Sequence, residues 1–414
     1  MFFENERQNK LEFLNVKDKK KYDNEIQKLK EKNRYFASFI IFIFCIICFF
    51  SSLSRSKTIT RARALKRGKK YMKQCFEGKL LNNNSKTFSL NPKISAVIPV
   101  YNCEKTIKAA VRSIQNQNMA DIEIILVNDN SQDNTSMIIT ELSKEDKRIK
   151  ILNNEKNMAT LYSRNIGILN SKGKYIMNLD NDDLFLDSDV FDTVYNEAEK
   201  GNYDIIGFGA VDCKTYNPLL TQIEEGLFHD HKDGLTVFQP DLTYFAITVN
   251  GEFEQNDLHV WGRLTKTELY KEAIDNFGLN AIGEKRNLSF LTWAEDSAMS
   301  MALFRYAKSY KFIKKYGIFH YLAQTTASHT SADSLMKYGY LFFIDTVFDF
   351  SHDNIKGKKF SVIMIDDVFE KFEKDKYNEK NLKYLKAILI KMLQCQYIST
   401  DDKKKLQKDF ESLG

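Results

Sequence analysis

The sequence predicts an α/β fold with a mostly parallel sheet and helices on both of its faces. Two observations carry this prediction. Between residues 93 and 187, short apolar runs rich in β-branched residues alternate with segments whose apolar residues recur at helical spacing. Strands that alternate with helices over this length pair in parallel through right-handed crossovers. With 414 residues, the chain is long enough for one large domain with additions, or for two domains.

The individual elements follow from the same patterns. Buried strands are predicted at residues 94–100, 121–127, 148–152, 174–179 and 203–209, with helices between them at about 107–114, 137–142 and 160–170. A hairpin-like stretch extends to about Phe245, and a helix follows the segment His259–Glu268. Another helix begins near Ala294 with acids in its first turn, and the pattern is helical and amphipathic from Ser334 onward.

The N-terminal part of the chain has a different composition. Residues 35–54 form a charge-free stretch of about 20 residues, the length that a helix needs to cross a bilayer. A cleaved signal peptide fits less well, because the apolar run starts late and no clear small-residue cleavage site follows. We therefore expect a charged tail (1–34), a transmembrane helix (35–54) and a basic stem or linker (55–92). This layout is typical of Golgi or endoplasmic reticulum enzymes, although basic residues on both sides of the span leave its orientation undecided.

Charge and cysteine content exclude some classes of protein. The chain has a net charge of +6, and lysines and arginines crowd into the first eighty residues, so the remainder has no net positive charge. Nucleic acid is therefore not an expected partner. The six cysteines show no metal-ligand or disulfide spacing.

Polar residues gather where the predicted strands end. Asn102, Asp129 and Asp180 each follow a strand, and ligands of such sheets bind beyond the carboxyl ends of the strands. The run Asp180–Asp183 places several oxygen ligands at this edge, where negative charge is unfavourable without a cation. Oxygen ligands suit Mg²⁺ or Mn²⁺, and such ions commonly serve phosphate chemistry.

Five motifs occur in one order and at compatible spacing along the chain. They are Pro99–Asn102, Asn128–Ser131, Ser163–Gly167, Leu179–Asp183 and Trp293–Asp296. Together they resemble the family-2 glycosyltransferases, which have a GT-A fold and transfer sugar from a nucleotide sugar. The resemblance is strong over residues 93–199 and fair to about 331. It implies a nucleotide-sugar-binding half (93–200), an acceptor-binding half (201–333) and a separate C-terminal helical region (334–414).

The resemblance assigns donor-binding roles to residues at the strand ends. It places Pro99 and Tyr101 at the nucleotide, and Asp129 at the uracil of a UDP-sugar. The family often has a second acid and a glycine beside Asp129, where this chain has Asn128 and Asn130; asparagine tolerates the left-handed conformation that glycine supplies. Asp129 could instead be a turn residue satisfied by its own backbone.

The same resemblance assigns residues that would contact the nucleotide, bind the metal and act as the catalytic base. Arg164 would contact the nucleotide, although a surface arginine is the alternative. Asp182 would ligate the metal, and Asp180 would serve the ribose or a metal-bound water, so that Mn²⁺ or Mg²⁺ neutralises the departing diphosphate. Asp296, paired with Glu295, would be the general base of an inverting transfer, and like charges side by side raise one pKa. Both acids could instead favour a helix N-terminus through its dipole.

Two further residues are candidates on the acceptor side. Trp261 lies where family members often carry a tryptophan-rich segment that stacks on sugar rings, although a core position is equally compatible. His320 lies near a region that closes over the diphosphate, which makes it a candidate metal or phosphate contact.

The predicted function is a membrane-anchored glycosyltransferase of the hexosyl or N-acetylhexosaminyl type, acting on a glycan, protein or lipid acceptor. The first alternative is an inactive anchored module that binds sugars or partners. The second is a sugar nucleotidyltransferase, which usually has a Gly-rich loop after its first strand; Pro99–Cys103 contains no glycine.

Overall fold

The structure is a computed structural model of the chain. It describes residues 66–80, 89–213, 228–229, 233–238, 248–249, 252–253, 259–276, 295–321, 333–350, 355–371 and 379–413. The chain divides into two compact units, Met1–Ala64 and Leu65–Gly414, and every described residue belongs to the second unit.

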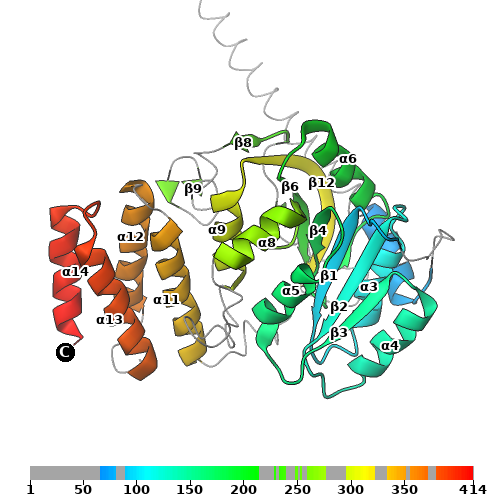
Figure 1. Cartoon of the computed structure of the whole chain (residues 1–414), viewed down its shortest axis with the longest axis horizontal. Coiled ribbons are helices and arrows are strands. Elements are labelled where there is room, and N and C mark those ends of the chain that lie inside the picture. Colours follow the sequence, from blue (N-terminus) through cyan, green and yellow to red (C-terminus); the bar gives the residue numbers. More distant parts are fainter. Residues whose placement is uncertain are drawn as a thin grey trace, which may run out of the picture. The chain divides into compact units, whose positions relative to one another are not determined.

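The first half of the main sheet is parallel, as predicted. Its strands are β1 (Ile94–Val100), β2 (Ile122–Asn128), β3 (Ile149–Asn153) and β4 (Tyr175–Asn178), and they lie in the order β3-β2-β1-β4. Ile94 pairs with Ile122 on one side and with Tyr175 on the other, so β1, β2 and β4 start level, while β4 ends opposite Val97, three residues before the end of β1. Figure 1 shows β1, β2 and β3 side by side.

Beyond β4 the sheet is mixed rather than parallel. The strand β11 (Arg263–Lys266) is antiparallel to both β4 and β6 (Ile205–Cys213). The long strand β12 (Ser309–Tyr321) runs parallel to β6, and its end pairs antiparallel with β5 (Leu184–Phe185). The remaining short strands are β7 (Phe228–His229) on β6, β8 (Thr236–Phe238) on β12, and the separate pair β9 (Thr248–Val249) and β10 (Glu252–Phe253). The sheet is therefore purely parallel in its first half and mixed in its second.

Helices cover both faces of the sheet, and each face has its own apolar core. The first core contains side chains of α3 (Ile107–Gln115), α4 (Thr135–Glu145) and α6 (Val190–Gly201). The second contains side chains of α5 (Ala159–Leu169), α8 (Thr267–Asn276) and α9 (Glu295–Tyr306). Along β1, Ala96 and Ile98 enter the first core and Val97 enters the second, because successive strand residues point to opposite faces. This explains why the strand is apolar without interruption.

The C-terminal region is helical, in agreement with its pattern. It contains α11 (Asp333–Phe350), α12 (Ile355–Lys371), α13 (Glu379–Gln394) and α14 (Thr400–Ser412). Helix α11 packs against α9, and apolar residues of all four C-terminal helices share the second core. Every residue of α9 from Ala298 to Phe304 is buried. Between its first turn, which contains Glu295 and Asp296, and Arg305, this helix therefore has no exposed face.

Residues 66–76 correct the expectation that 55–92 is only a stem or linker. They form a helix, called helix 66–76 below, whose residues Tyr71, Met72 and Cys75 are buried. The Tyr71 hydroxyl donates to the carbonyl oxygen of Ser113 in α3 at 2.8 Å. This part of the predicted linker is thus packed on the sheet-covering helix α3.

The expected membrane anchoring also needs correction. Among the described residues, no helix has both the length and the apolarity to cross a bilayer. This finding contradicts the prediction of a single-pass membrane protein of the Golgi or endoplasmic reticulum. The expected span, residues 35–54, and the expected tail, residues 1–34, lie outside the described residues.

Candidate active site

The structure brings the predicted donor-binding residues to one edge of the parallel half-sheet. Asp129 follows β2, and its backbone N–H donates to the carbonyl oxygen of Val100 at the end of β1, at 2.8 Å. On the other side of β1, the Asn181 side-chain amide donates to the carbonyl oxygen of Pro99 at 3.1 Å. The loops after β1, β2 and β4 are therefore fastened to one another. Tyr101 is 42% exposed at this edge.

Asp129 is buried and bonded to a neighbouring loop. Its Oδ1 accepts hydrogen bonds from the side-chain amide of Asn154 at 2.7 Å and from the backbone N–H of Met158 at 2.8 Å. The alternative in which Asp129 is satisfied by its own turn is wrong, because both donors lie more than twenty residues away in the chain. Asn130 has φ of 61°, the left-handed conformation expected of it. Reading of a nucleobase by Asp129 stays a prediction.

Arg164 joins the two halves of the site. Its guanidinium donates to Asp180 Oδ1 at 2.7 Å and to Asp296 Oδ1 at 2.9 Å. The arginine side chain is 2% exposed, so the alternative of a surface arginine is wrong. Burial disfavours the charged guanidinium, but Asp296 and Asp180 outweigh that effect and raise the pKa of Arg164. In this structure the guanidinium of Arg164 bonds the two carboxylates. Its direct contact with a nucleotide stays a prediction.

The acidic loop after β4 holds several aspartate carboxylates that are buried and repel one another. Burial and the neighbouring Asp180 raise the pKa of Asp182 to about 6. Asp183 is fully buried; its Oδ1 accepts the backbone N–H of Tyr321 at 2.9 Å, and its Oδ2 has no hydrogen-bond partner among the described residues. Burial, together with Asp182 and Asp180, raises the pKa of Asp183 as well. A cation at this loop would relieve the repulsion.

His320 lies at the end of β12 beside this loop. Its Nδ1 is 2.9 Å from Oδ1 of the buried Asp212 in β6. Burial lowers the pKa of His320, but the hydrogen bond to Asp212 and the charge of Asp183 outweigh it and raise the pKa to about 9. The imidazole is therefore protonated at neutral pH in this structure. A positive charge there suits a phosphate contact, whereas metal ligation would require the proton to leave.

Trp261 is a core residue in this structure. It is 5% exposed, and its ring packs against those of His259, with centroids 4.2 Å apart, and His320, with centroids 4.7 Å apart. So little exposed ring leaves no open face of Trp261 for a sugar. The direct stacking of Trp261 on the acceptor is therefore corrected in favour of the core position, in which its ring packs against that of His320.

The acid pair begins helix α9, where the helix dipole favours negative charge. Besides Arg164, the backbone amide of Val260 lowers the pKa of Asp296. Burial raises the pKa of Asp296, and Arg164 opposes this shift without cancelling it. Burial and the charge of Asp296 raise the pKa of Glu295 to about 8. A carboxylate with a raised pKa is a better proton acceptor, which suits a general base. Trp293 and Ala294 lie outside the described residues.

The residues present fit a divalent metal that is shared with substrate phosphates. Among the described residues, no three His, Cys, Asp or Glu side chains form a group that could hold a metal by themselves. Mg²⁺ commonly takes only one or two protein carboxylates, with substrate phosphates and water completing its shell. Asp182 and Asp180 supply two carboxylates, and the unpartnered Asp183 Oδ2 lies in the same loop. The metal itself remains a proposal.

Two residues of the site were not predicted from the sequence. Asp212 orients His320, and its only signal is an acid near the end of an apolar strand. Asn154 holds Asp129 and also bonds the Ser163 hydroxyl at 2.9 Å, ahead of Arg164 in α5. Asparagine in a polar loop carries no distinguishing signal.

Comparison with known proteins gives a consistent picture. Residues 95–272 match the model of the Glycosyl transferase family 2. The chain is 31% identical over 246 residues to EpsJ of Bacillus subtilis, an uncharacterised glycosyltransferase, covering 56% of this chain and 61% of EpsJ. It is 35% identical over 117 residues to the Campylobacter jejuni GalNAc(5)-diNAcBac-PP-undecaprenol beta-1,3-glucosyltransferase, covering 28% of this chain and 38% of that protein. The chain thus spans less than two thirds of either relative.

Solved structures agree on the fold. The S. aureus TarS fragment 1–349 in complex with UDP superposes with a TM-score of 0.52 at 15% identity, covering 78% of this chain and 89% of the fragment. The same fragment in complex with UDP-GlcNAc gives a TM-score of 0.51 at 14% identity, covering 77% and 92%. Residues 95–272 are thus similar to glycosyl transferase family 2, and the comparisons support a glycosyltransferase.

Proposed function

We propose that the protein transfers a sugar from a nucleotide sugar, most simply a UDP-sugar, to an acceptor hydroxyl with the help of a divalent metal. The observation that carries this proposal is the Arg164 bridge. One guanidinium binds an acid of the donor loop, Asp180, and the candidate base, Asp296, at 2.7 and 2.9 Å. The donor loop and the candidate base are thereby held at fixed positions relative to each other, which favours alignment of the donor with the acceptor hydroxyl.

The donor side is assigned to the strand-end loops. Asp129 and Tyr101 would face the nucleotide, and the loop 180–183 would face the diphosphate. The choice of uridine rests on Asp129, and it is in keeping with the UDP and UDP-GlcNAc complexes of TarS, which share only the fold with this chain. The protonated His320, held by Asp212, would add a positive charge near the diphosphate.

Asp182 and Asp180 would hold Mg²⁺ or Mn²⁺. When bound, such an ion supplies Lewis-acid stabilisation of the charge that develops on the departing diphosphate. In this chain the unmet charge of Asp182 and Asp183 favours cation binding, because burial and mutual repulsion raise the pKa of both carboxyls.

Asp296 would act as the general base. Its carboxylate takes the proton of the acceptor hydroxyl while the hydroxyl oxygen forms the bond to the anomeric carbon. The bond from that carbon to the diphosphate oxygen breaks, and its electron pair leaves with the nucleoside diphosphate. Attack from the opposite side inverts the anomeric centre. Because Arg164 occupies Oδ1, the proton would go to Oδ2 of Asp296.

The test uses the full-length protein with a panel of nucleotide sugars. Release of the nucleoside diphosphate, and calorimetric titration with UDP, are measured with Mg²⁺, with Mn²⁺ and with EDTA. We expect metal-dependent UDP binding and donor turnover, with Asp296→Asn losing turnover but retaining UDP binding. Absence of nucleotide binding under all conditions would leave a non-enzymatic binding module. Release of pyrophosphate from UTP and a sugar phosphate would instead identify a nucleotidyltransferase.

A further inference from the structure

The segment that follows the acidic loop is held by a helix outside the family domain. We propose that helix 66–76 and Gln117 form a brace that positions the acidic loop 180–183 for the donor, so that Tyr71 and Gln117 are positioning residues of the site. The inference rests on the proposed function, because it concerns the donor loop of that reaction. It extends the catalytic unit beyond residues 95–272 to a part of the chain expected to be a linker.

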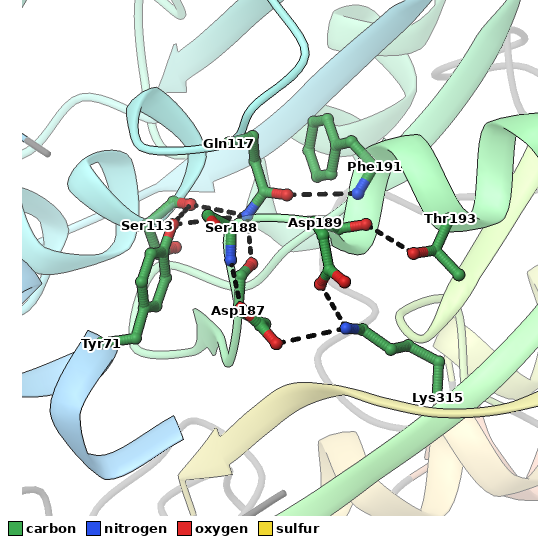
Figure 2. Close-up of polar contacts among 9 residues, drawn as sticks. All are labelled: Tyr71, Ser113, Gln117, Asp187, Ser188, Asp189, Phe191, Thr193 and Lys315. Carbon is green, nitrogen blue, oxygen red and sulfur yellow. Dashed lines mark hydrogen bonds and ion pairs between the residues drawn. The ribbon is translucent and has the colours of Figure 1, made fainter. Parts of the chain in front are cut away.

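Gln117 is the centre of this brace. It is fully buried just after α3. Its Nε2 donates to the carbonyl oxygen of Asp187 at 2.7 Å and to that of Ser113 at 3.0 Å, and its Oε1 accepts the backbone N–H of Phe191 at 3.1 Å. The next residue, Asn118, donates its backbone N–H to the carbonyl oxygen of Ser188 at 2.7 Å. One side chain thus fixes the backbone at both ends of residues 187–191, as Figure 2 shows.

Tyr71 connects helix 66–76 to the same centre. Its hydroxyl donates to the Ser113 carbonyl oxygen at 2.8 Å and accepts from Gln117 Nε2 at 3.4 Å. The Ser113 hydroxyl in turn accepts the backbone N–H of Phe185 at 3.1 Å. Figure 2 shows the tyrosine reaching from its helix into this cluster. The Gln117 amide, the Asn118 backbone N–H and the Ser113 hydroxyl therefore bond the backbone that continues from Asp183, and Tyr71 is connected to it through Ser113 and Gln117.

Direct packing adds to these hydrogen bonds. A Cβ atom added at Gly68 of helix 66–76 would lie 2.8 Å from Leu186 Cδ2, closer than side-chain carbons normally approach. Leu186 is itself buried. The helix therefore lies in close contact with Leu186 of this segment.

The opposite side of the segment is fastened to β12. The Leu186 backbone N–H donates to the carbonyl oxygen of Gly317 at 2.9 Å, and Lys315 forms ion pairs with Asp187, at 3.3 Å, and with Asp189. Strand β12 carries His320 and ends at Tyr321, whose backbone N–H donates to Asp183 Oδ1 at 2.9 Å. The segment is thus held between the brace and the strand that carries His320.

The braced segment is only a few residues along the chain from the carboxylates of the acidic loop, so its position bears on donor binding. Asp182 lies three residues before Phe185, whose backbone is already fixed by Ser113. Because the connection is this short, a displacement of the backbone at Phe185 also displaces the carboxylate of Asp182. Misplacement of reacting groups by about 1 Å can cost roughly a hundredfold in rate. Loosening the brace would therefore act on turnover and on the metal-dependent affinity for the donor.

The experiment compares point variants of the full-length protein. Tyr71→Phe removes one hydroxyl of the brace, and Gln117→Met removes its central amide while keeping the length of the side chain. Tyr175→Phe is the matched control, because it removes a buried hydroxyl that bonds Glu199 at 2.7 Å outside the brace. Lys70→Ala, on the exposed side of helix 66–76, controls for changes in the helix itself.

Three readouts separate positioning from loss of folding. Hydrogen exchange of the amides of residues 184–191 needs no substrate, and we expect it to accelerate in both brace variants but in neither control. At a temperature well below all the melting temperatures, we expect kcat to fall about 10-fold to 100-fold. We also expect the Mn²⁺ concentration for half-maximal UDP binding to rise, while the KM of the acceptor is unchanged.

Unchanged exchange in both brace variants would overturn the proposal, as would kinetic losses equal to those of Tyr175→Phe. If the wild-type protein transfers no sugar, the proposed function is wrong, but this result does not decide whether the brace positions the loop. The exchange experiment and metal-dependent nucleotide binding then still decide whether the brace controls the loop.

Discussion

Removing Arg164 should damage both the stability of the fold and the pH profile of the reaction. In Arg164→Met the side chain keeps its apolar bulk and loses both hydrogen bonds to carboxylates. A hydrogen bond to a charged group contributes about 1.5–3 kcal/mol. Asp180 and Asp296 are 30% and 23% exposed, so water can partly replace the guanidinium and the lower value applies to each bond. The expected loss is about 3 kcal/mol, within the range for a broken buried ion pair.

The effect on pH follows from the sign of the electrostatic interaction. Arg164 lowers the pKa of Asp296 against the larger effect of burial. Without Arg164, the pKa of Asp296 rises further. The base must be ionised to accept a proton, so the acidic limb of the kcat profile should move to higher pH. Arg164→Lys should restore the limb only in part, because one ammonium cannot bind two carboxylates as a guanidinium does.

Arg148→Met is the matched control for both measurements. Arg148 is 1% exposed and bonds Asp146 at 2.9 Å, away from the proposed site. Urea unfolding, followed by the fluorescence of the two tryptophans, should show a comparable loss of stability in this variant, with the acidic limb unchanged. An unshifted limb in Arg164→Met, or a stability loss below about 1 kcal/mol, would refute the reasoning.

Three further predictions concern other parts of the molecule. Asp182→Asn should lose about 4 kcal/mol of barrier reduction, roughly a thousandfold in metal-dependent kcat; full wild-type turnover in excess EDTA would contradict it. Gly167→Ala should destabilise the protein by about 1–3 kcal/mol, because its Cβ would lie 2.5 Å from Val97 Cγ1; an unchanged melting temperature would exclude this close packing. The pKa of Glu295 is raised from 4.5 to about 8, so the folded state binds the extra proton and stability should fall as pH rises between these values. Glu295→Gln should flatten that fall in urea unfolding measured from pH 5 to 8, and an equal slope in both proteins would argue against it.

The parallel half of the fold was predictable because both of its faces are buried. A strand such as Ile94–Val100 must then be apolar throughout, and the helices between strands must repeat every three to four residues. The mixed half lacks this signal. The strand β11, Arg263–Lys266, contains two basic residues in four, and β5 contains only two residues. Their places in the sheet depend on pairing with distant strands, which a local pattern does not encode.

The candidate site divides in the same way. Acids at the carboxyl ends of parallel strands of one sheet meet at one edge, so the grouping of Asp129 after β2 and Asp180 after β4 followed from the alternation of strands and helices. The Arg164–Asp296 bond joins residues 132 positions apart, and no spacing rule predicts it. Helix 66–76 was misread because its exposed face is strongly basic, while the buried face consists of few residues, among them Tyr71 and Met72.

Helix α9 has a consequence for engineering and for the divergence of related chains. Its residues from Ala298 to Phe304 are all buried, and α11 packs against it. A chimaera that exchanges α9 without α11 would mismatch a complete helix surface and displace Asp296. The acceptor-side half and the C-terminal helices should therefore be inherited and exchanged as one block. Arg164 connects this block to the donor half through its hydrogen bonds to Asp296 and Asp180. Both parental sequences of a chimaera would have to keep these three residues.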